Sequence, residues 1–186
     1  VLKGIEQLVN ESSVPLIVKE TGAGINSAVA KRLLNVGVKV IDVAGVGGTS
    51  WSRVEAARIS SRPETDKVGS TLTRKYELEM QERFNEWGNS TVYCLKSLQE
   101  LAWEREFEII ASGGIRHAQD MIKARCLGAH FVAVAQPVVR VLKEEGLTGL
   151  EKWFSLWRKE ATMIMTLLGV REWRLLSEEY ITPHSS

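Results

Sequence analysis

The sequence predicts an α/β fold in which the short strands of one parallel sheet alternate with helices. Four short apolar runs, at residues 14–19, 38–44, 108–113 and 131–136, have the composition of strands buried in such a sheet. The first two runs begin about two dozen residues apart, which suits a right-handed βαβ unit. Four such units are half of the eight in a (β/α)₈ barrel. This chain has 186 residues, fewer than the about 250 that a whole barrel takes.

Composition indicates a single globular domain. Hydrophobic residues make up 44% of the chain, charged residues 25%, and the formal net charge is +1. We expect no nucleic-acid partner, because such domains carry a strong basic excess. No apolar run is long enough to span a bilayer and no signal segment opens the chain, so we expect no membrane association and a cytoplasmic location. Cys94 and Cys126 lie in apolar patterns, which is typical of reduced core thiols.

The first unit begins with a helix and continues into a strand. Residues 1–9 carry the apolar stripe of a helix, and because the chain opens with Val1 inside that pattern we expect a fragment of a longer protein. The nearly continuous apolar run at 14–19 predicts a strand buried on both faces. A glycine turn follows, and Asn26 or Ser27 then caps the next helix.

The second unit carries an insertion. We expect these elements in order: a strand at 38–44, a helix at 53–58, a polar loop at 60–66, a charged helix at 72–87 and a helix at 91–101. The loop and the charged helix make residues 59–89 an insert within one domain that spans residues 1–186.

The last two units repeat the rhythm of strand and helix. We expect a strand at 108–113, a helix at 119–127, a strand at 131–136 and a tail helix at 150–168. Trp153, Phe154 and Trp157 lie along one face of the tail helix and predict core packing. Residues 177–186 are expected to be frayed.

Glycines end the third strand and point to a phosphate-bearing ligand. The run that ends in Gly113 and Gly114 exposes backbone N–H groups, and the helix that follows adds partial positive charge. The fourth strand stops beside it, just before Gln136. Phosphates bind at this edge in a (β/α)₈ barrel. Arg116 follows the glycines closely enough to complement a phosphate, whereas His117 reads as a surface residue.

Two further strand ends carry groups with more than one interpretation. Lys19 can pair with the electron-rich edge of a flavin, form a Schiff base, or make an ion pair with Asp42 on the neighbouring strand. Thr49 follows a glycine cluster and can donate a hydrogen bond to a ligand or only cap a helix. No histidine has a partner at metal-ligand spacing, so no metal site is expected.

Four motifs together resemble the type 2 isopentenyl-diphosphate isomerase family. They are Val-Pro-Leu-Ile-Val-Lys-Glu-Thr-Gly-Ala-Gly at 14–24, Asp-Val-Ala-Gly-Val-Gly-Gly-Thr-Ser-Trp at 42–51, Glu-Trp-Gly at 86–88 and Ile-Ala-Ser-Gly-Gly-Ile-Arg at 110–116. The resemblance implies an FMN-dependent TIM barrel that interconverts isopentenyl and dimethylallyl diphosphate, with Mg²⁺ and with NADPH as the flavin reductant. It makes the four strands the fifth to eighth of the barrel.

The resemblance also implies a set of FMN-binding residues. Lys19 matches a lysine that contacts the flavin ring, and Ala44 and Thr49 match positions that line the flavin. The residues that match the phosphate loop and its neighbouring strand end are Gly113, Gly114, Ile115, Arg116, Ala135 and Gln136. The chain departs from the family pattern after the Trp-Gly pair, after Arg116 and at Gln136.

The same resemblance places other functions outside this chain. The catalytic and diphosphate-binding residues and the Mg²⁺ ligands are expected upstream of Val1, so we expect no isomerase activity from this chain alone. The expected partners are a diphosphate substrate, an N-terminal half-barrel and further copies in a homo-oligomer.

Two other functions stay open at this point. One is another FMN-barrel enzyme similar to glutamate synthase; 2-hydroxy-acid oxidases need a histidine that residues 42–51 lack. The other is a non-catalytic half-barrel that acts by assembly, because an isolated half exposes two sheet edges.

Overall fold

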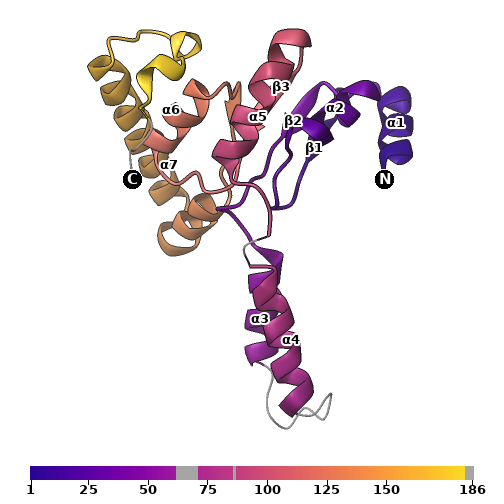
Figure 1. Ribbon diagram of the computed structural model, residues 1–186. Coiled ribbons are helices and arrows are strands. Elements are labelled where there is room, and N and C mark those ends of the chain that lie inside the picture. Colours follow the sequence, from indigo (N-terminus) through magenta and orange to yellow (C-terminus); the bar gives the residue numbers. More distant parts are fainter. Residues whose placement is uncertain (62–70, 86, 183–186) are drawn as a thin grey trace.

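The computed structural model describes residues 1–61, 71–85 and 87–182 of the chain. These residues form a four-stranded, wholly parallel sheet in the order β1-β2-β3-β4. The strands are β1 (Ile17–Lys19), β2 (Val40–Asp42), β3 (Glu108–Ala111) and β4 (Phe131–Val132). The predicted α/β class with a parallel sheet is confirmed, and each strand lies within its expected range (Figure 1).

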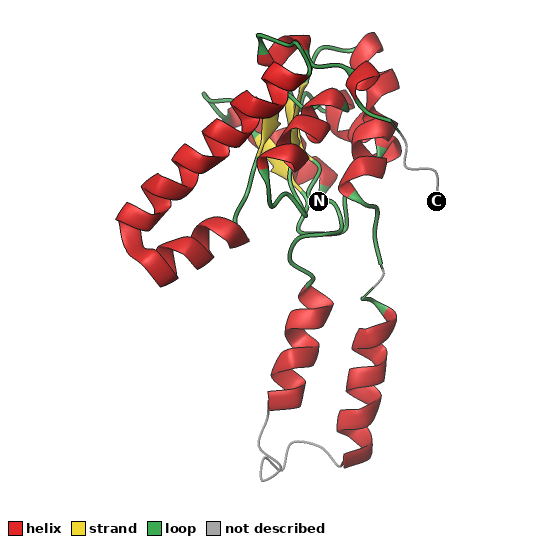
Figure 2. Cartoon of the chain, turned by 90° about the vertical axis from the view of Figure 1, so that its left-hand side faces the viewer, coloured by secondary structure: helices red, strands yellow, loops and turns green. Residues whose placement is uncertain are grey.

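Helices pack beside the sheet, and others extend away from it (Figure 2). They are α1 (Leu2–Glu11), α2 (Ser27–Asn35), α3 (Trp51–Ser61), α4 (Thr71–Arg83), α5 (Thr91–Glu104), α6 (Ala118–Cys126) and α7 (Gln136–Leu167), with the short 3₁₀ turns η1 (Trp173–Leu175) and η2 (Glu178–Tyr180). None of the helices described combines the length and the apolar character needed to cross a membrane.

The main core lies between the sheet and the helices α2, α5 and α6. Ile41 and Ile109 from the central strands pack with Leu95 and Leu98 from α5, and all four side chains are fully buried. Asn26 caps α2 as expected, since its side-chain oxygen accepts a hydrogen bond from Val29 N at 3.1 Å. Helix α2 therefore begins where its sequence directs and covers the sheet with its apolar face.

Both cysteines are free and buried, as the sequence predicts. Burial raises the pKa of the Cys94 thiol to about 11, and the nearby Glu20 carboxylate adds to the effect. Burial also raises the pKa of Cys126. A thiol that stays protonated is a poor nucleophile, so both residues act as small apolar groups in the core.

The expectation that the run at 14–19 is buried on both faces was wrong. β1 is an edge strand, and the Ile17 side chain is 59% exposed. The opposite edge is open as well, because Phe131 in β4 is 53% exposed. Val18 instead points to the core and packs against it. One face of β1 is therefore buried against the core, whereas its other face and its edge remain uncovered.

A second cluster joins α6 to the end of the chain. Ile122 and Cys126 of α6 pack against Val170 and Leu176. The expected fraying over residues 177–186 was wrong for its first part. Glu178 begins a 3₁₀ turn and forms an ion pair with Lys96, whose Nζ lies 3.4 Å from Glu178 Oε1. Ile181 packs against both clusters. Residues 183–186 lie outside the described part of the chain.

The tail helix begins earlier than predicted. α7 starts at Gln136 instead of 150, and it bends at Gly146, whose φ of 66° is outside the helical region. The aromatic face is only partly in the core: Trp157 packs against the main cluster, whereas Phe154 is 48% exposed. Sequence periodicity placed the second half of α7 correctly and missed the half before the bend.

The predicted insert is a projecting helical arm. Helices α3 and α4 run side by side away from the sheet in both views (Figures 1 and 2), and we call this pair the arm. It begins at Trp51, eight residues before the expected insert, and α4 ends at Arg83, earlier than expected. The predicted polar loop at 60–66 and Glu86 lie largely outside the described residues.

Replacing Leu98 tests how much the packing of α5 in the main core contributes to stability. We expect Leu98→Ala to lower the free energy of unfolding by about 2–5 kcal/mol, because Leu98 is fully buried and its truncation leaves a cavity. Urea denaturation followed by circular dichroism measures the change. Leu156→Ala on the exposed side of α7 is the matched control and should change stability by less than about 0.5 kcal/mol. Equal effects would contradict the assigned core.

Candidate functional site

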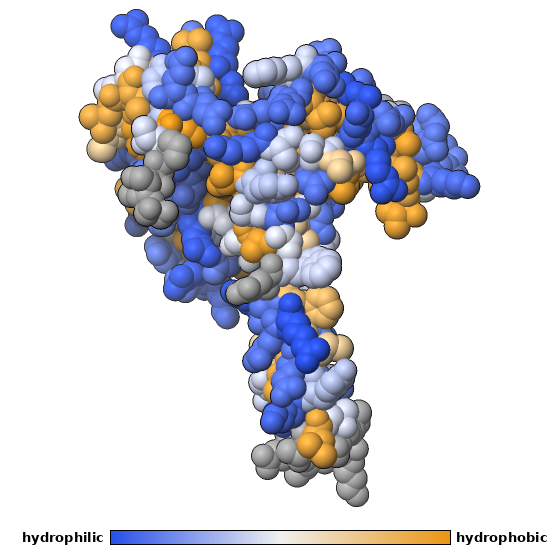
Figure 3. Space-filling view, viewed as in Figure 1, coloured by the Kyte–Doolittle hydropathy of each residue, from blue (hydrophilic) through white to orange (hydrophobic). Residues whose placement is uncertain are grey.

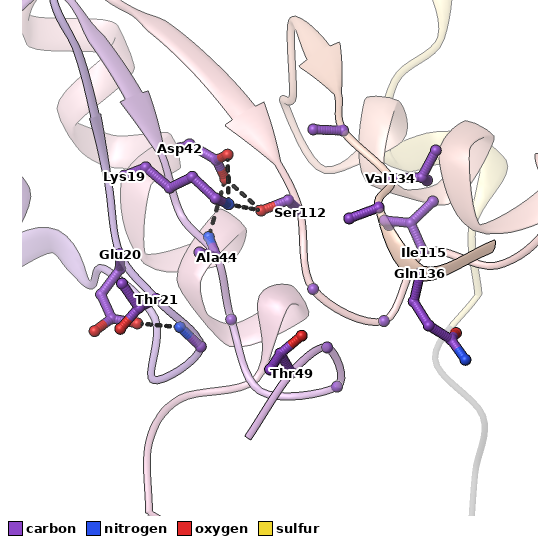
Figure 4. A pocket seen from close by; sticks show the side chains of 18 of the residues that line it. Lys19, Glu20, Thr21, Asp42, Ala44, Thr49, Ser112, Ile115, Val134 and Gln136 are labelled. Carbon is purple, nitrogen blue, oxygen red and sulfur yellow. Dashed lines mark hydrogen bonds and ion pairs between the residues drawn. The ribbon is translucent and has the colours of Figure 1, made fainter. Parts of the chain in front are cut away.

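A concave site lies where the four strands end. It is a cavity of about 360 Å³ lined by the segments that follow β1, β2, β3 and β4 (Figure 4). The carboxyl ends of parallel strands share one edge of the sheet, so residues far apart in the chain meet there. All nine residues expected to bind a cofactor line this cavity: Lys19, Ala44, Thr49, Gly113, Gly114, Ile115, Arg116, Ala135 and Gln136.

Lys19, Asp42 and Ser112 form a compact polar network at the ends of β1, β2 and β3 (Figure 4). Lys19 Nζ lies 2.8 Å from Asp42 Oδ2 and donates to Ser112 Oγ, also at 2.8 Å. Ser112 Oγ in turn donates to Asp42 Oδ1 at 2.5 Å, and Ala44 N donates to the same oxygen at 3.1 Å. The Asp42 carboxylate is therefore saturated by donors from three strand ends.

This network contains the ion pair that was one of the three interpretations of Lys19. Asp42 is almost fully buried, whereas the Lys19 side chain is 54% exposed and lines the cavity. The ion pair is present, and it holds a positive charge at the cavity surface where an electron-rich group can approach.

Ala44 adopts an unusual backbone conformation in this lining. Its φ of 41° lies in the left-handed region, which side-chain-bearing residues rarely adopt. The hydrogen bond from its N–H to Asp42 Oδ1 accompanies this turn of the chain. The backbone thus bends directly after β2 and brings the glycine segment at 45–48 over the cavity.

The turn after β3 offers unpaired backbone donors. Gly113 and Gly114 have φ values of 94° and 82°. Within the part of the chain that the structure describes, the N–H groups of Gly113, Gly114 and Ile115 donate no hydrogen bond. A Cβ on Gly113 would overlap the carbonyl oxygen of Gly45, so only glycine fits. Successive free N–H groups in such a turn form an anion-binding concavity.

The helix after this turn contributes less than predicted. Asp120 Oδ2 already accepts the N–H groups of Arg116 at 2.9 Å and His117 at 3.1 Å. The carboxylate therefore neutralises the N-terminus of α6, which we expected to attract an anion. Arg116 can meet a ligand only through its exposed side chain.

The start of α7 provides a second group of donors. Ala135 is the N-cap of α7, and the carbonyl oxygen of Ala135 accepts the N–H of Val139 at 3.0 Å. The N–H of Gln136 has no acceptor among the described residues, and Pro137 has no N–H to satisfy. This helix end faces the same cavity as the turn at 113–115.

Sequence reasoning missed Ser112 and two further residues that shape the site. Thr91 Oγ1 lies 2.7 Å from Gly113 O and 3.0 Å from Ser112 O, and so anchors the glycine turn from α5. Glu20 Oε2 accepts the backbone N–H groups of Gly22 at 2.6 Å and Gly24 at 3.1 Å. An acidic residue two positions before a glycine turn could have indicated the second contact, whereas nothing local marks Thr91 as a partner of residue 113.

Comparison with known families decides the relationship of this chain. Residues 2–183 match the model of the FMN-dependent dehydrogenase family. The chain belongs to the FMN-dependent dehydrogenase family. Among its curated relatives, a Chlorobium phaeovibrioides protein is 39% identical to this chain over 91% of its residues. A Thermococcus onnurineus protein is 38% identical over 92% of this chain. Both are named isopentenyl-diphosphate delta-isomerase, and the chain spans only 45% and 41% of their lengths.

Solved structures agree on the fold. A mutant flavocytochrome b2 with benzoylformate has a TM-score of 0.66 at 21% identity, over 96% of this chain and 37% of that one. A mutant of the active chimera of (S)-mandelate dehydrogenase has a TM-score of 0.68 at 17% identity, over 97% and 40%. The α/β fold of this chain is therefore structurally like the part of FMN-dependent TIM-barrel oxidoreductases that it matches.

The cavity of this FMN-dependent dehydrogenase family member fits the cofactor that the family name implies. Side chains at Gly113 or Gly47 would fill the space where backbone donors face the cavity, since a Cβ on Gly47 would lie 3.1 Å from Gly114 Cα. The donors at 113–115, the Arg116 side chain and the N-terminus of α7 suit a phosphate dianion. Among the described residues no group of three or more His, Cys, Asp or Glu side chains could hold a metal ion.

His130 serves the sheet instead of the cavity. Its Nδ1 accepts a hydrogen bond from Ile109 N at 3.1 Å, which requires an unprotonated nitrogen. Partial burial lowers the pKa of His130, and the Arg125 guanidinium adds to the effect. This histidine therefore joins β3 to the start of β4 in its neutral form.

Neutralising Asp42 should weaken the fold through the network it completes. We expect Asp42→Asn to lower the free energy of unfolding by about 1–3 kcal/mol, because an amide cannot match the donors from Lys19 and Ser112. Urea denaturation measures the change. Glu6→Gln on the exposed side of α1 is the matched control, with an expected change below about 0.5 kcal/mol. An unchanged Asp42→Asn variant would show that the network does not stabilise the strand ends.

Proposed function

We propose that this chain is the FMN-binding half of a barrel enzyme that interconverts isopentenyl and dimethylallyl diphosphate. The observation that carries the proposal is the joint position of Lys19, Arg116 and the free N–H groups at 113–115 in one cavity. It is supported by relatives named isopentenyl-diphosphate delta-isomerase at 36–39% identity over more than nine-tenths of this chain.

We further propose that the four strands are the fifth to eighth of that barrel. The relatives are more than twice as long as the stretch they share with this chain. Both edges of the sheet are open, and Ile17 and Phe131 expose apolar surface there. Further strands that pair with β1 and β4 would cover these edges, as barrel closure does.

In this proposal the residues around the cavity divide between the two ends of FMN. The backbone donors at 113–115, the start of α7 and the Arg116 guanidinium would hold the phosphate. Lys19, which Asp42 and Ser112 hold in position, would meet the edge of the ring. When bound, reduced FMN supplies the acid and base for proton transfer at an unactivated alkene. Lys19 stabilises negative charge at the edge of the ring, and the glycines around Gly47 leave room for it.

The other requirements of the reaction fall outside this chain in our proposal. Within the described ranges of the chain, no group of three or more His, Cys, Asp or Glu side chains could hold a metal ion such as Mg²⁺. We assign the Mg²⁺ ligands, the diphosphate-binding residues and the contacts to NADPH, the flavin reductant, to the other half of the barrel. This chain then binds and orients the cofactor, and its partner half completes the substrate site.

Flavin titration tests the binding part of the proposal. We expect FMN fluorescence to be quenched by the purified chain at micromolar concentration, and riboflavin, which lacks the phosphate, to bind at least about tenfold more weakly. Arg116→Ala should weaken FMN binding about tenfold while leaving riboflavin binding unchanged. Arg140→Ala on the exposed side of α7 is the control and should change neither. Equal affinities for FMN and riboflavin would contradict the phosphate assignment.

Complementation tests the reaction. We expect no isomerase activity from this chain alone, since the substrate-binding groups lie elsewhere in our proposal. Co-expression with the part of the Chlorobium phaeovibrioides relative that this chain does not cover should restore FMN-dependent conversion of isopentenyl diphosphate, measured with NADPH and Mg²⁺. Oxidation of a 2-hydroxy acid by the same mixture, without isomerisation, would contradict the proposal and favour a dehydrogenase.

A further inference from the structure

The outer side of the arm carries an uncovered apolar stripe. Leu72, Tyr76, Met80 and Phe84 recur at four-residue spacing, so they lie on one side of α4 and its C-terminal extension. We call these four residues the α4 stripe, and their exposed fractions range from 39% to 78%. Figure 3 shows hydrophobic atoms at the surface of the projecting arm. Large exposed apolar side chains that recur on one side of a helix indicate an interaction site.

Helix α3 does not cover the stripe. The arm is held together on its other side, where Ile59 of α3 is 3% exposed and Leu78 of α4 is partly buried. Leu78 lies about 200° around the helix from Tyr76. The arm also runs away from the sheet in Figures 1 and 2, so the core does not reach the stripe. α4 is therefore apolar on two sides, and α3 occupies only one.

We propose that a second copy of this chain covers the α4 stripe, through antiparallel pairing of the two α4 helices. Along the helix, the midpoint of the stripe is at the level of residue 78. A two-fold axis through the interface at this level sets Leu72 opposite the partner's Phe84 and Tyr76 opposite the partner's Met80. Self-complementary surfaces of this kind form two-fold dimers. The pairing is independent of the proposed function, since no stripe residue lines the cavity.

Charges beside the stripe match the same arrangement. Lys75, Glu79 and Glu82 lie along one edge of it, with the cation toward the start of α4 and the anions toward its end. In an antiparallel pair like edges meet, so Lys75 faces the partner's Glu82. The Lys75 side chain is 74% exposed, and its ion pair with Glu79 in its own helix is long, at 3.9 Å. It is free to reach across such an interface.

The charge balance also argues against a lipid surface as the occupant. Helix α4 carries three basic residues (Arg74, Lys75, Arg83) and three acidic ones (Glu77, Glu79, Glu82). Helices that bind anionic membranes carry a basic excess on the polar side. Three exposed large side chains, Tyr76, Met80 and Phe84, are of the types enriched at protein interfaces.

A short segment of the chain connects the arm to the cavity. Helix α3 starts at Trp51, two residues after Thr49, which lines the cavity. Pairing of two arms therefore restrains the segment that carries Gly47, Gly48 and Thr49. The interface and the cofactor cavity are joined by this short connection, although each is built from different residues.

Sedimentation equilibrium of the full chain tests the pairing. We expect a reversible dimer, and the double variant Tyr76→Ser/Met80→Ser should raise its dissociation constant about 100-fold, because central aromatic and methionine contacts dominate such interfaces. Met163→Ser/Leu167→Ser has the same four-residue spacing on the exposed side of α7 and should leave the constant unchanged. Circular dichroism confirms that both variants keep their helices, and FMN titration confirms an intact cavity in each.

Disulfide trapping tests the direction of pairing. Mixing a Tyr76→Cys chain with a Met80→Cys chain under oxidation should give a covalent heterodimer, whereas each variant alone should cross-link poorly. Cys94 and Cys126 are buried and do not compete. A monomeric chain, equal dissociation constants for the stripe and α7 variants, or efficient cross-linking of Tyr76→Cys alone would overturn the proposal. Loss of FMN binding with dimerisation intact would overturn the proposed function instead.

Discussion

The buried carboxylate of Asp42 is the constraint on which the end of the sheet depends. It lies at the end of β2 and accepts hydrogen bonds from Lys19 at the end of β1, from Ser112 after β3 and from the backbone of Ala44. A buried carboxylate that loses its partners is strongly destabilising, so the three strand ends must keep their positions together. The same contacts aim the Lys19 ammonium at the cavity, and structure and site therefore share one network.

The glycine turns form a second layer on this network. The Gly113 turn packs so closely against Gly45 and Gly47 that a side chain on Gly113 would collide with the backbone. Thr91 holds this turn from the buried side. Backbone donors are thus fixed at the cavity surface, an arrangement by which parallel sheets can bind anions at their carboxyl edge.

Sequence patterns predicted most of the fold because the strands and helices carry strong local signals. The four strands, the Asn26 cap and the burial of both cysteines follow from periodicity and capping preference. The exposure of Ile17 did not, since an edge strand and a central strand have the same apolar composition. The packing of Ile181 was missed because its partners lie far away in the chain.

The sequence by itself determined the parallel α/β fold, the glycine-rich strand ends and nine of the residues that line the cavity. Only the tertiary structure decided that Asp42 joins three strands, that Asp120 rather than a ligand occupies the N-terminus of α6, and that α3 leaves one side of α4 bare. The physical reason is that local sequence sets the conformation of a segment. Which donors, acceptors and apolar surfaces remain unpaired depends on contacts between distant segments.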